Sequence, residues 1–273
     1  NKIGTDVTGT VALGNHKGIV VTKRSNLNGI GGTTRARGNI ISGNDSCGIQ
    51  LSTWANLIQA NYIGVDKTGN NLLGNGADGI FMPVPVGINI IGGAVPGQGN
   101  LISGNAHHGI NLISGSLTAI TGNIIGLSAD SLNIVPNHGD GIRLDTGSVF
   151  VAIGGGTVPG YNVIAGNDSV GVHLVGTAGG HTIAGNFIGC VYAGATLIPA
   201  GNGLDGIRID ENSFWSSKIG DSLALGVINY IGFNGGDGIS IVNDNGNRLY
   251  RNAIFYNNEL GIDLGDDGVT TNA

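Results

Sequence analysis

The sequence predicts an all-β fold, a right-handed parallel β-helix (solenoid) with three short strands per coil and about nine coils. Glycine supplies 53 of the 273 residues and charged residues make up only 11%, a composition that does not suit a helical domain. Hydrophobic residues still make up 40% of the chain, which is enough to bury a core. The third observation is an internal repeat of about thirty residues, the signature of a solenoid.

Each repeat opens with a Gly-Ile or Gly-Val pair followed by alternating side chains. Apolar residues at period two favour strands, and a glycine or asparagine every few residues would end any helix. Inward Ile, Leu and Val of one coil would pack on the next coil, about 4.8 Å away, in a rod on the order of 40 Å long. The pairs begin at Gly18, Gly48, Gly79, Gly109, Gly141, Gly171, Gly206, Gly238 and Gly261, at spacings of 30, 31, 30, 32, 30, 35, 32 and 23 residues.

The shortest repeat shows the elements of one coil in chain order. Residues 238–260 contain the runs GISI, NRLYRN and AIFYNNEL, which are separated by polar corners. Three strand-like runs per coil predict a triangular cross-section. Longer repeats keep these runs and add an insertion of roughly eight residues at one of two corners.

The two kinds of insertion predict two rows of loops along the solenoid, because insertions in a repeat protein map to loops on its faces. One kind follows the second run and the other follows the third run. They alternate, which gives a longer period of about 62 residues. The first kind occupies residues 30–39, 88–100 and 151–162, and the second kind occupies residues 1–15, 61–75, 123–137 and 186–202.

Asparagine recurs at the corner that follows the third run. Asparagine tolerates left-handed backbone, so we expect left-handed turn geometry at these residues, with their amides stacked in a ladder between coils. A Ser-Gly or Ala-Gly pair before three of them belongs to the same turn. The asparagines are Asn44, Asn105, Asn167, Asn234 and Asn257.

The chain is expected to form a single solenoid over residues 1–273, as an internal segment of a longer protein. It opens within a repeat and shows no amphipathic capping segment, and an uncapped solenoid exposes strand edges. Flanking segments or identical copies are the partners that would cover those edges. Cys47 and Cys190 lie at different positions of the repeat and are expected to be unpaired.

The charge and hydropathy patterns exclude two classes of partner. The net charge is −6 and the twelve Lys and Arg residues are scattered, so there is no basic stripe for nucleic acid phosphates. Glycine or a polar residue interrupts every apolar stretch before it reaches the roughly 18 residues that cross a bilayer. We therefore expect neither nucleic acid binding nor membrane insertion.

Four motifs carry a family resemblance: NIISGN at 39–44, NYIGVDKTGN at 61–70, NLISGN at 100–105 and ELGIDLGDDGVT at 259–270. They resemble motifs of the bacterial right-handed parallel β-helix repeat proteins, within the pectin-lyase-like superfamily. The resemblance covers essentially the whole chain and implies a secreted or cell-surface, extracellular protein. It implies no single function, because this architecture carries lyases, hydrolases, epimerases, adhesins and passive spacers.

The first run of each coil presents one outward side chain, two residues after the glycine. Arg143, His173 and Arg208 occupy this position in three consecutive coils. Such a face could bind an acidic or neutral sugar, with His173 as a general base if its pKa lies near neutrality. Alternatively, the charges pair across coils and keep the rod soluble. The carboxylates that flank the three residues are Asp140, Asp145, Asp205 and Asp210.

Catalysis is less favoured than binding for this face. The pectin-degrading relatives cluster carboxylates on neighbouring strands, whereas the coil between the two Asp-bearing coils carries Val170, His173 and Val175. No catalytic residue is therefore assigned. If the chain is an enzyme, the resemblance implies a polysaccharide lyase or a glycoside hydrolase.

Calcium is the one cofactor to consider, because it prefers carboxylate, amide and carbonyl oxygens. The loops TDVTGT at 5–10 and VDKTGN at 65–70 share an Asp, but the later copies LSADSL and CVYAGA lose it at that position. A turn-forming role is therefore favoured, and no cofactor is required. The weak calcium candidates are Asp6, Asp66, Asp266 and Asp267.

The sequence favours a structural or adhesive segment without catalytic activity, such as a stalk, an adhesin shaft or a filament subunit. The alternative is a β-helix that binds or processes carbohydrate through the Arg143, His173 and Arg208 face, with cell-surface or matrix polysaccharide as the partner. Aromatic residues make up only 5% of the chain, so no long aromatic platform is expected. The aromatic residues to watch are Trp54, Phe81, Phe214, Trp215 and Tyr256.

Overall fold

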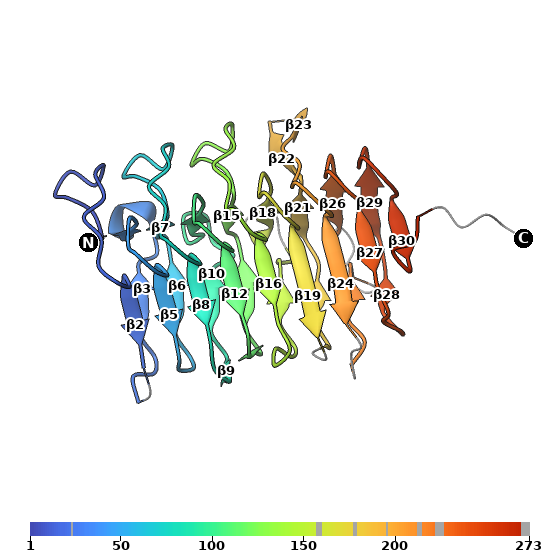
Figure 1. The fold of residues 1–273 in the computed structure, drawn as a ribbon, viewed down its shortest axis with the longest axis horizontal. Coiled ribbons are helices and arrows are strands. Elements are labelled where there is room, and N and C mark those ends of the chain that lie inside the picture. The colour runs from blue at the N-terminus through green and yellow to red at the C-terminus, as the bar shows by residue number, and fades with distance from the viewer. Residues whose placement is uncertain are drawn as a thin grey trace, which may run out of the picture.

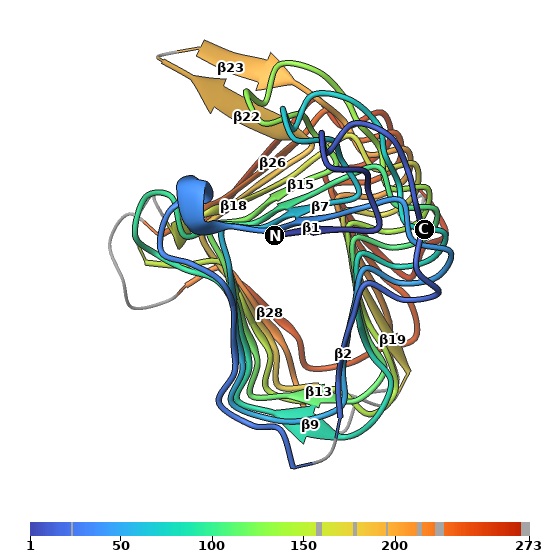
Figure 2. The same ribbon diagram turned by 90° about the vertical axis from the view of Figure 1, so that its left-hand side faces the viewer.

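The computed structural model describes residues 1–22, 24–156, 160–176, 179–194, 196–211, 215–221 and 227–268. Within these residues the chain winds as a right-handed parallel β-helix, and three parallel sheets run along its axis. Figures 1 and 2 show the coils stacked in sequence order, with the three sheets enclosing the lumen. The predicted fold class, three strands per coil and about nine coils are confirmed.

Each sheet collects the same run from successive coils, and the pairing between coils is parallel throughout. Sheet 1 contains β2 (Ile19–Val21), β5 (Ile49–Leu51), β8 (Ile80–Met82), β12 (Ile110–Leu112), β16 (Ile142–Leu144), β19 (Val172–Gly176), β24 (Ile207–Glu211), β27 (Ile239–Ile241) and β30 (Ile262–Leu264). Sheet 2 contains β3 (Gly29–Gly31), β6 (Leu57–Gln59), β10 (Ile90–Gly92), β14 (Ala119–Thr121), β17 (Ala152–Ile153), β20 (Thr182–Ile183), β25 (Lys218–Ile219) and β28 (Arg248–Leu249). Sheet 3 contains β1 (Lys2–Ile3), β4 (Ile40–Ile41), β7 (Tyr62–Ile63), β11 (Leu101–Ile102), β15 (Ile124–Ile125), β18 (Asn162–Ile164), β21 (Asn186–Ile188), β26 (Asn229–Gly232) and β29 (Asn252–Phe255).

The core is a column of stacked aliphatic side chains that fills the lumen. In each central coil the alternate residues of the three strands point inward, as Ile110, Ile120 and Ile125 do, and these are fully buried. The register of the strands places equivalent residues of successive coils beside each other, so that Ile110 pairs with Ile80 on one side and Ile142 on the other. Because each buried isoleucine is worth about 1.5–3 kcal/mol of transfer free energy, this column is the main stabilising element.

Two continuous asparagine ladders close two corners of the solenoid. At each step the side-chain amide donates to the side-chain carbonyl of the equivalent asparagine in the next coil, over 2.8–3.2 Å. The ladder after sheet 3 confirms the predicted one and also includes asparagines at the ends of the loop insertions. It runs through Asn15, Asn44, Asn75, Asn105, Asn137, Asn167, Asn202, Asn234 and Asn257. The other, between sheets 2 and 3, runs through Asn1, Asn39, Asn61, Asn100, Asn123, Asn162, Asn186, Asn229 and Asn252.

The expected left-handed geometry at the corner asparagines is wrong. The left-handed residue is the preceding glycine, with φ of 72° at Gly43, 77° at Gly104 and 70° at Gly166. The asparagine must keep ordinary backbone geometry so that its amide lies along the axis and reaches the next coil. Phe233 and Tyr256 occupy the glycine position in the last two coils, with φ of 64° and 52°, and this conformation costs a non-glycine residue about 1–2 kcal/mol.

The predicted insertions form two rows of loops on either side of sheet 3 (Figure 2). The row after sheet 3 is cross-connected, because the backbone of Lys67 donates to Gly9 over 2.9 Å and that of Ala129 donates to Gly69 over 3.0 Å. Its last copy is an antiparallel hairpin of β22 (Cys190–Ala193) and β23 (Thr196–Pro199). The row before sheet 3 contains the short 3-10 helix η1 (Arg35–Arg37). A further pair of strands, β9 (Val86–Gly87) and β13 (Gly115–Ser116), lies between sheets 1 and 2.

Two smaller expectations concern cysteines and membrane spans. Cys47 and Cys190 are both buried and unpaired, as predicted. In the described part of the chain, no helix has the length and apolar character to cross a membrane.

Candidate functional site

The outward residues of sheet 1 lie in one row along the solenoid, in the predicted register. Strand pairing places Arg143 beside His173 and His173 beside Arg208. The whole row contains Val20, Gln50, Phe81, Asn111, Arg143, His173, Arg208, Ser240 and Asp263.

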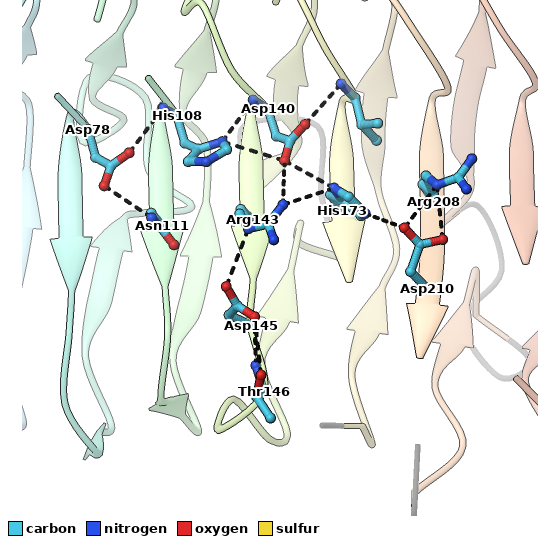
Figure 3. A network of polar contacts seen from close by, with 11 residues as sticks. Asp78, His108, Asn111, Asp140, Arg143, Asp145, Thr146, His173, Arg208 and Asp210 are labelled. Atoms are coloured by element: carbon cyan, nitrogen blue, oxygen red, sulfur yellow. Dashed lines mark hydrogen bonds and ion pairs between the residues drawn. The ribbon is translucent and has the colours of Figure 1, made fainter. Parts of the chain in front are cut away.

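Asp140 is the centre of a polar network on this face (Figure 3). Its side chain is 3% exposed. One carboxylate oxygen accepts the backbone N–H of Val170 over 3.1 Å. The other oxygen lies 3.1 Å from His173 Nδ1 and 3.4 Å from both an Arg143 nitrogen and His108 Nδ1. Burial disfavours the ionised form of this carboxylate and would raise its pKa. The hydrogen bonds to the carboxylate, of which that of His173 is the strongest, outweigh burial and lower the pKa of Asp140 to about 2.

The pKa values of the two histidines of the network are shifted in opposite directions. Both ring nitrogens of His173 face carboxylates, with Nε2 2.9 Å from Asp210, and Nδ1 also lies 3.3 Å from an Arg143 nitrogen. Burial alone would lower the pKa of His173, but its bonds to Asp140 and Asp210 raise it. In His108, Nδ1 accepts the backbone N–H of Asp140 over 2.9 Å, and burial lowers the pKa of this ring.

Arg208 extends the network toward the C-terminal coils. Its guanidinium contacts Asp210 at 2.9 Å, Asp205 at 3.2 Å and Asp266 at 2.7 Å. Burial opposes its charge, but these three carboxylates raise the pKa of Arg208 further above its ordinary value. Asp145 is more peripheral, since it contacts Arg143 at 3.4 Å and otherwise bonds to its own turn. All seven predicted residues of this face therefore lie in one connected network.

The titratable side chains of this network contact one another, and these contacts limit the acid–base chemistry that they can carry out. A general base needs a free lone pair, and both nitrogens of His173 lie within hydrogen-bond distance of carboxylates of the same chain, Asp140 and Asp210. The pKa of Asp210 is held below its ordinary value despite burial, by His173 and Arg208, so Asp210 is not suited to act as a general acid near neutral pH. The cations are likewise occupied by carboxylates. Arg143 and Arg208 pair with carboxylates of their own coils, and His173 joins the coils on either side of it.

Carboxylates at the corner before sheet 1 accept hydrogen bonds from the next coil, a role that was not predicted from the sequence. The residue before the repeat glycine accepts the backbone N–H of its equivalent one coil later, as Asp78 does from His108 over 3.1 Å and Asp205 does from Asp237 over 2.8 Å. Its second oxygen accepts from the outward residue of the next coil, Asn111 for Asp78 and Ser240 for Asp205. The recurrence of Asp immediately before the Gly-Ile pair was a signal that could have revealed it.

The calcium candidates Asp6 and Asp66 bind their own loops. Asp6 accepts from the Thr8 hydroxyl and from two backbone N–H groups, and these bonds, led by Thr8, hold its pKa well below the ordinary value. Asp66 accepts from Thr68 and Asn71, which lower its pKa although burial opposes this. Both arrangements are those expected of turn-forming aspartates.

Asp237, Asp263 and Asp266 bring carboxylate oxygens within 4.8 Å of one another. Asp266 also contacts Arg208, so a cation here would compete with that guanidinium, and Asp267 is exposed nearby. Asp263 takes the place that a donor, Asn111 or Ser240, fills in other coils. Asp237 and Asp263 are 2% and 5% exposed, so two buried carboxylates lie close together, and the donors given for them are backbone N–H groups.

Asp237→Asn is expected to raise the free energy of unfolding by about 1 kcal/mol in chelator-containing buffer, since it removes a like-charge contact and supplies a donor. The asparagine would keep the bond from the Leu260 backbone N–H, which is 2.6 Å long. Urea denaturation would measure the change. Asp45→Asn removes an exposed charge and is the control, with an effect within about 0.5 kcal/mol. A loss of stability in Asp237→Asn would contradict the prediction.

His173→Gln is expected to lower the free energy of unfolding by about 2 kcal/mol, with a defined pH dependence. Since folding raises the pKa of His173 above its ordinary 6.5, its stabilisation is complete below that value and is lost as pH rises through the folded pKa. The difference in the free energy of unfolding between wild type and His173→Gln should therefore become smaller in alkaline buffer. Urea denaturation at a series of pH values would measure it. His138→Gln, at an exposed pair with Asp168, is the control; an equal loss at every pH would refute the assignment.

Aromatic side chains gather on the outside of sheet 3 near the C-terminal coils, in a local cluster that was not predicted from the sequence. Phe187 stacks on Tyr230 with ring centroids 5.1 Å apart, and Phe233 stacks on Tyr256 at 5.7 Å. Of the residues to watch, Trp54 is exposed, Trp215 contacts Phe150, and Phe214 lies outside the described residues. The cluster contains Tyr161, Phe187, Tyr192, Tyr230, Phe233, Phe255 and Tyr256.

No protein-family model matches the chain, and no curated protein matches it. The fold is that of a parallel β-helix, an architecture that does not by itself assign a function.

Proposed function

We propose that the chain is a non-catalytic structural segment of an extracellular bacterial protein, a rod-forming part of a stalk, shaft or filament. The single observation that carries the proposal is the saturation of the sheet 1 face. His173, Arg143 and Arg208 each contact carboxylates of the same chain. The two arginines are paired with carboxylates of their own coils, and His173 joins the coils on either side of it through Asp140 and Asp210.

Two further features support a rod. Both asparagine ladders continue through all the coils without interruption, which favours a uniform shaft over a pocketed enzyme. The core is likewise one continuous column of buried aliphatic side chains along the described coils. Identical copies or flanking segments are the partners that we propose. The resemblance of the Asn-Gly repeats to bacterial surface β-helix proteins supports the extracellular location.

The test combines electron microscopy with a glycan array, on wild type and on the double variant Arg143→Ala/Arg208→Ala. End-to-end rods, with array signals that the double variant leaves unchanged, are the expected result. Isolated particles whose glycan binding disappears in the double variant would replace the proposal with a carbohydrate-binding or carbohydrate-processing function at sheet 1. Circular dichroism of the double variant would establish that it remains folded.

A further inference from the structure

A groove of about 670 Å³ lies outside sheet 3 at the N-terminal coils. Its floor includes Ile40 and Tyr62, one wall includes Arg35 of η1, and the opposite wall includes Asp6 and Lys67 of the loops that follow sheet 3. Figure 2 shows η1 and these loops standing on opposite sides of sheet 3. The groove is on a different face from the sheet 1 network.

The groove concentrates positive charge in a chain whose net charge is −6. Lys2, Arg35 and Lys67 line it and are all exposed. Within the described part of the chain, none of these three cations forms an ion pair with a carboxylate. This contrasts with sheet 1, where each arginine is paired with two or more carboxylates.

The one acidic residue in the lining, Asp6, carries a single negative charge and is not paired with any of the three cations. The Asp6 carboxylate is directed into its own loop, where it accepts from the Thr8 hydroxyl and from the backbone N–H groups of Thr10 and Val11. An anion that enters the groove therefore meets three cations and one carboxylate that is already saturated with donors.

Arg35 and Tyr62 form a prearranged pair in the groove. The guanidinium carbon of Arg35 lies 5.8 Å from the centre of the Tyr62 ring, and an Arg35 nitrogen donates to the Tyr62 hydroxyl over 3.3 Å. The pair orients the guanidinium, which lowers the entropy lost when it binds an anion. The hydroxyl accepts from Arg35, so its own proton can be donated to a ligand.

We propose that this groove binds an anionic oligosaccharide that carries sulfate or phosphate esters. Each ester presents terminal oxygens in several directions, so it can be shared by a guanidinium from one wall and an ammonium from the other. A planar carboxylate suits a single guanidinium. The Tyr62 ring adds an apolar surface beside the guanidinium that a sugar ring can contact.

Other polyanions fit the groove less well. Single-stranded nucleic acid binding relies on several aromatic rings along a basic track, and Tyr62 is the only ring in this lining. An acidic peptide would use the cations but would gain little from a ring and hydroxyl placed for a sugar. Both polymers serve as competing probes in the test.

The experiment is isothermal titration calorimetry at low salt, with a heparin-derived hexasaccharide, a phosphorylated mannohexaose, hexagalacturonate, neutral maltohexaose, polyglutamate and oligothymidylate. Sulfated or phosphorylated sugar, or both, should bind more tightly than the other probes, and the affinity should fall as salt screens the charges. The stronger of the two ester-bearing probes identifies the source of the anion. Equal binding of neutral maltohexaose, or tighter binding of polyglutamate, oligothymidylate or hexagalacturonate, would overturn the proposal.

Paired charge variants locate the site. Arg35→Gln/Lys67→Gln should weaken binding on the order of tenfold, which corresponds to about 0.7 kcal/mol for each exposed charge contact. Lys218→Gln/Arg248→Gln removes the same charge from exposed positions on sheet 2 and should change the affinity less than about twofold. Equal losses in the two double variants would show that only net charge matters and would overturn the proposal. Because all four side chains are exposed, both variants should fold.

Discussion

Asn123→Ala is expected to lower the free energy of unfolding by about 3–5 kcal/mol, because it leaves several buried polar groups without partners. Asn123 is fully buried. Its carbonyl accepts from the backbone and the side chain of Asn100 over 3.0 and 2.9 Å, and its amide donates to Ile91 and Asn162 over 2.9 and 3.1 Å. Urea denaturation, followed by circular dichroism and by intrinsic fluorescence, would measure the loss.

The matched control for Asn123 is Asn258→Ala. Asn258 is exposed and donates one side-chain hydrogen bond, to Gly235 over 3.3 Å, so its replacement should cost within about 0.5 kcal/mol. In a solenoid each coil contacts only its neighbours. Hydrogen exchange in Asn123→Ala should therefore accelerate first at strands β11, β15 and β18. Equal losses in the two variants would contradict a special role for the ladder.

Asp140→Ala is the second large change, with an expected loss of about 3–5 kcal/mol, because it removes one partner from a buried charge network. His173 and Arg143 would each lose a carboxylate, and the backbone N–H of Val170 would lose its acceptor. Since folding lowers the pKa of Asp140 to about 2, its contribution is present above its ordinary pKa of 3.8 and is lost as pH falls toward that folded value. The difference in the free energy of unfolding between wild type and Asp140→Ala should therefore become smaller at acidic pH.

Asp145→Ala is the control for Asp140. It removes a carboxylate from the same face, but the Asp145 side chain is 26% exposed and lies 3.4 Å from its arginine partner. Its loss should cost less than about 1 kcal/mol. If Asp140→Ala and Asp145→Ala both lowered the free energy of unfolding only slightly, the network would be a set of solvated charges that does not stabilise the fold.

The fold could be predicted from the sequence because the repeat fixes the strand register. One glycine position aligned all nine coils, so the neighbours of His173 in sheet 1 were placed correctly from spacing alone. It was harder to predict from the sequence whether a side chain bonds to its own coil or to a neighbouring coil. Asp140 bonds one coil forward and also contacts Arg143 of its own coil, and only backbone geometry decides between such partners.

Two surfaces escaped prediction because their residues come from separate coils. The basic residues were taken as scattered, yet Lys2, Arg35 and Lys67 are 33 and 32 residues apart, about one coil, and so meet in one groove. Similarly, Phe187 and Tyr230 are 43 residues apart but pair directly in sheet 3. Insertions of variable length change the spacing from coil to coil, so composition alone gave no sign of either surface.

The hydrogen bonds between coils, including both asparagine ladders, run along the axis of the rod, and this determines its mechanical behaviour. When the two ends are pulled apart, the load falls on a terminal coil, which can detach while the remaining coils keep their contacts. A coil of 30–32 residues contributes about 4.8 Å of folded length but about 100 Å of extended chain. The segment would therefore behave as a tether that lengthens in discrete steps, one coil at a time, and the length contributed by each detached coil would rise roughly twentyfold.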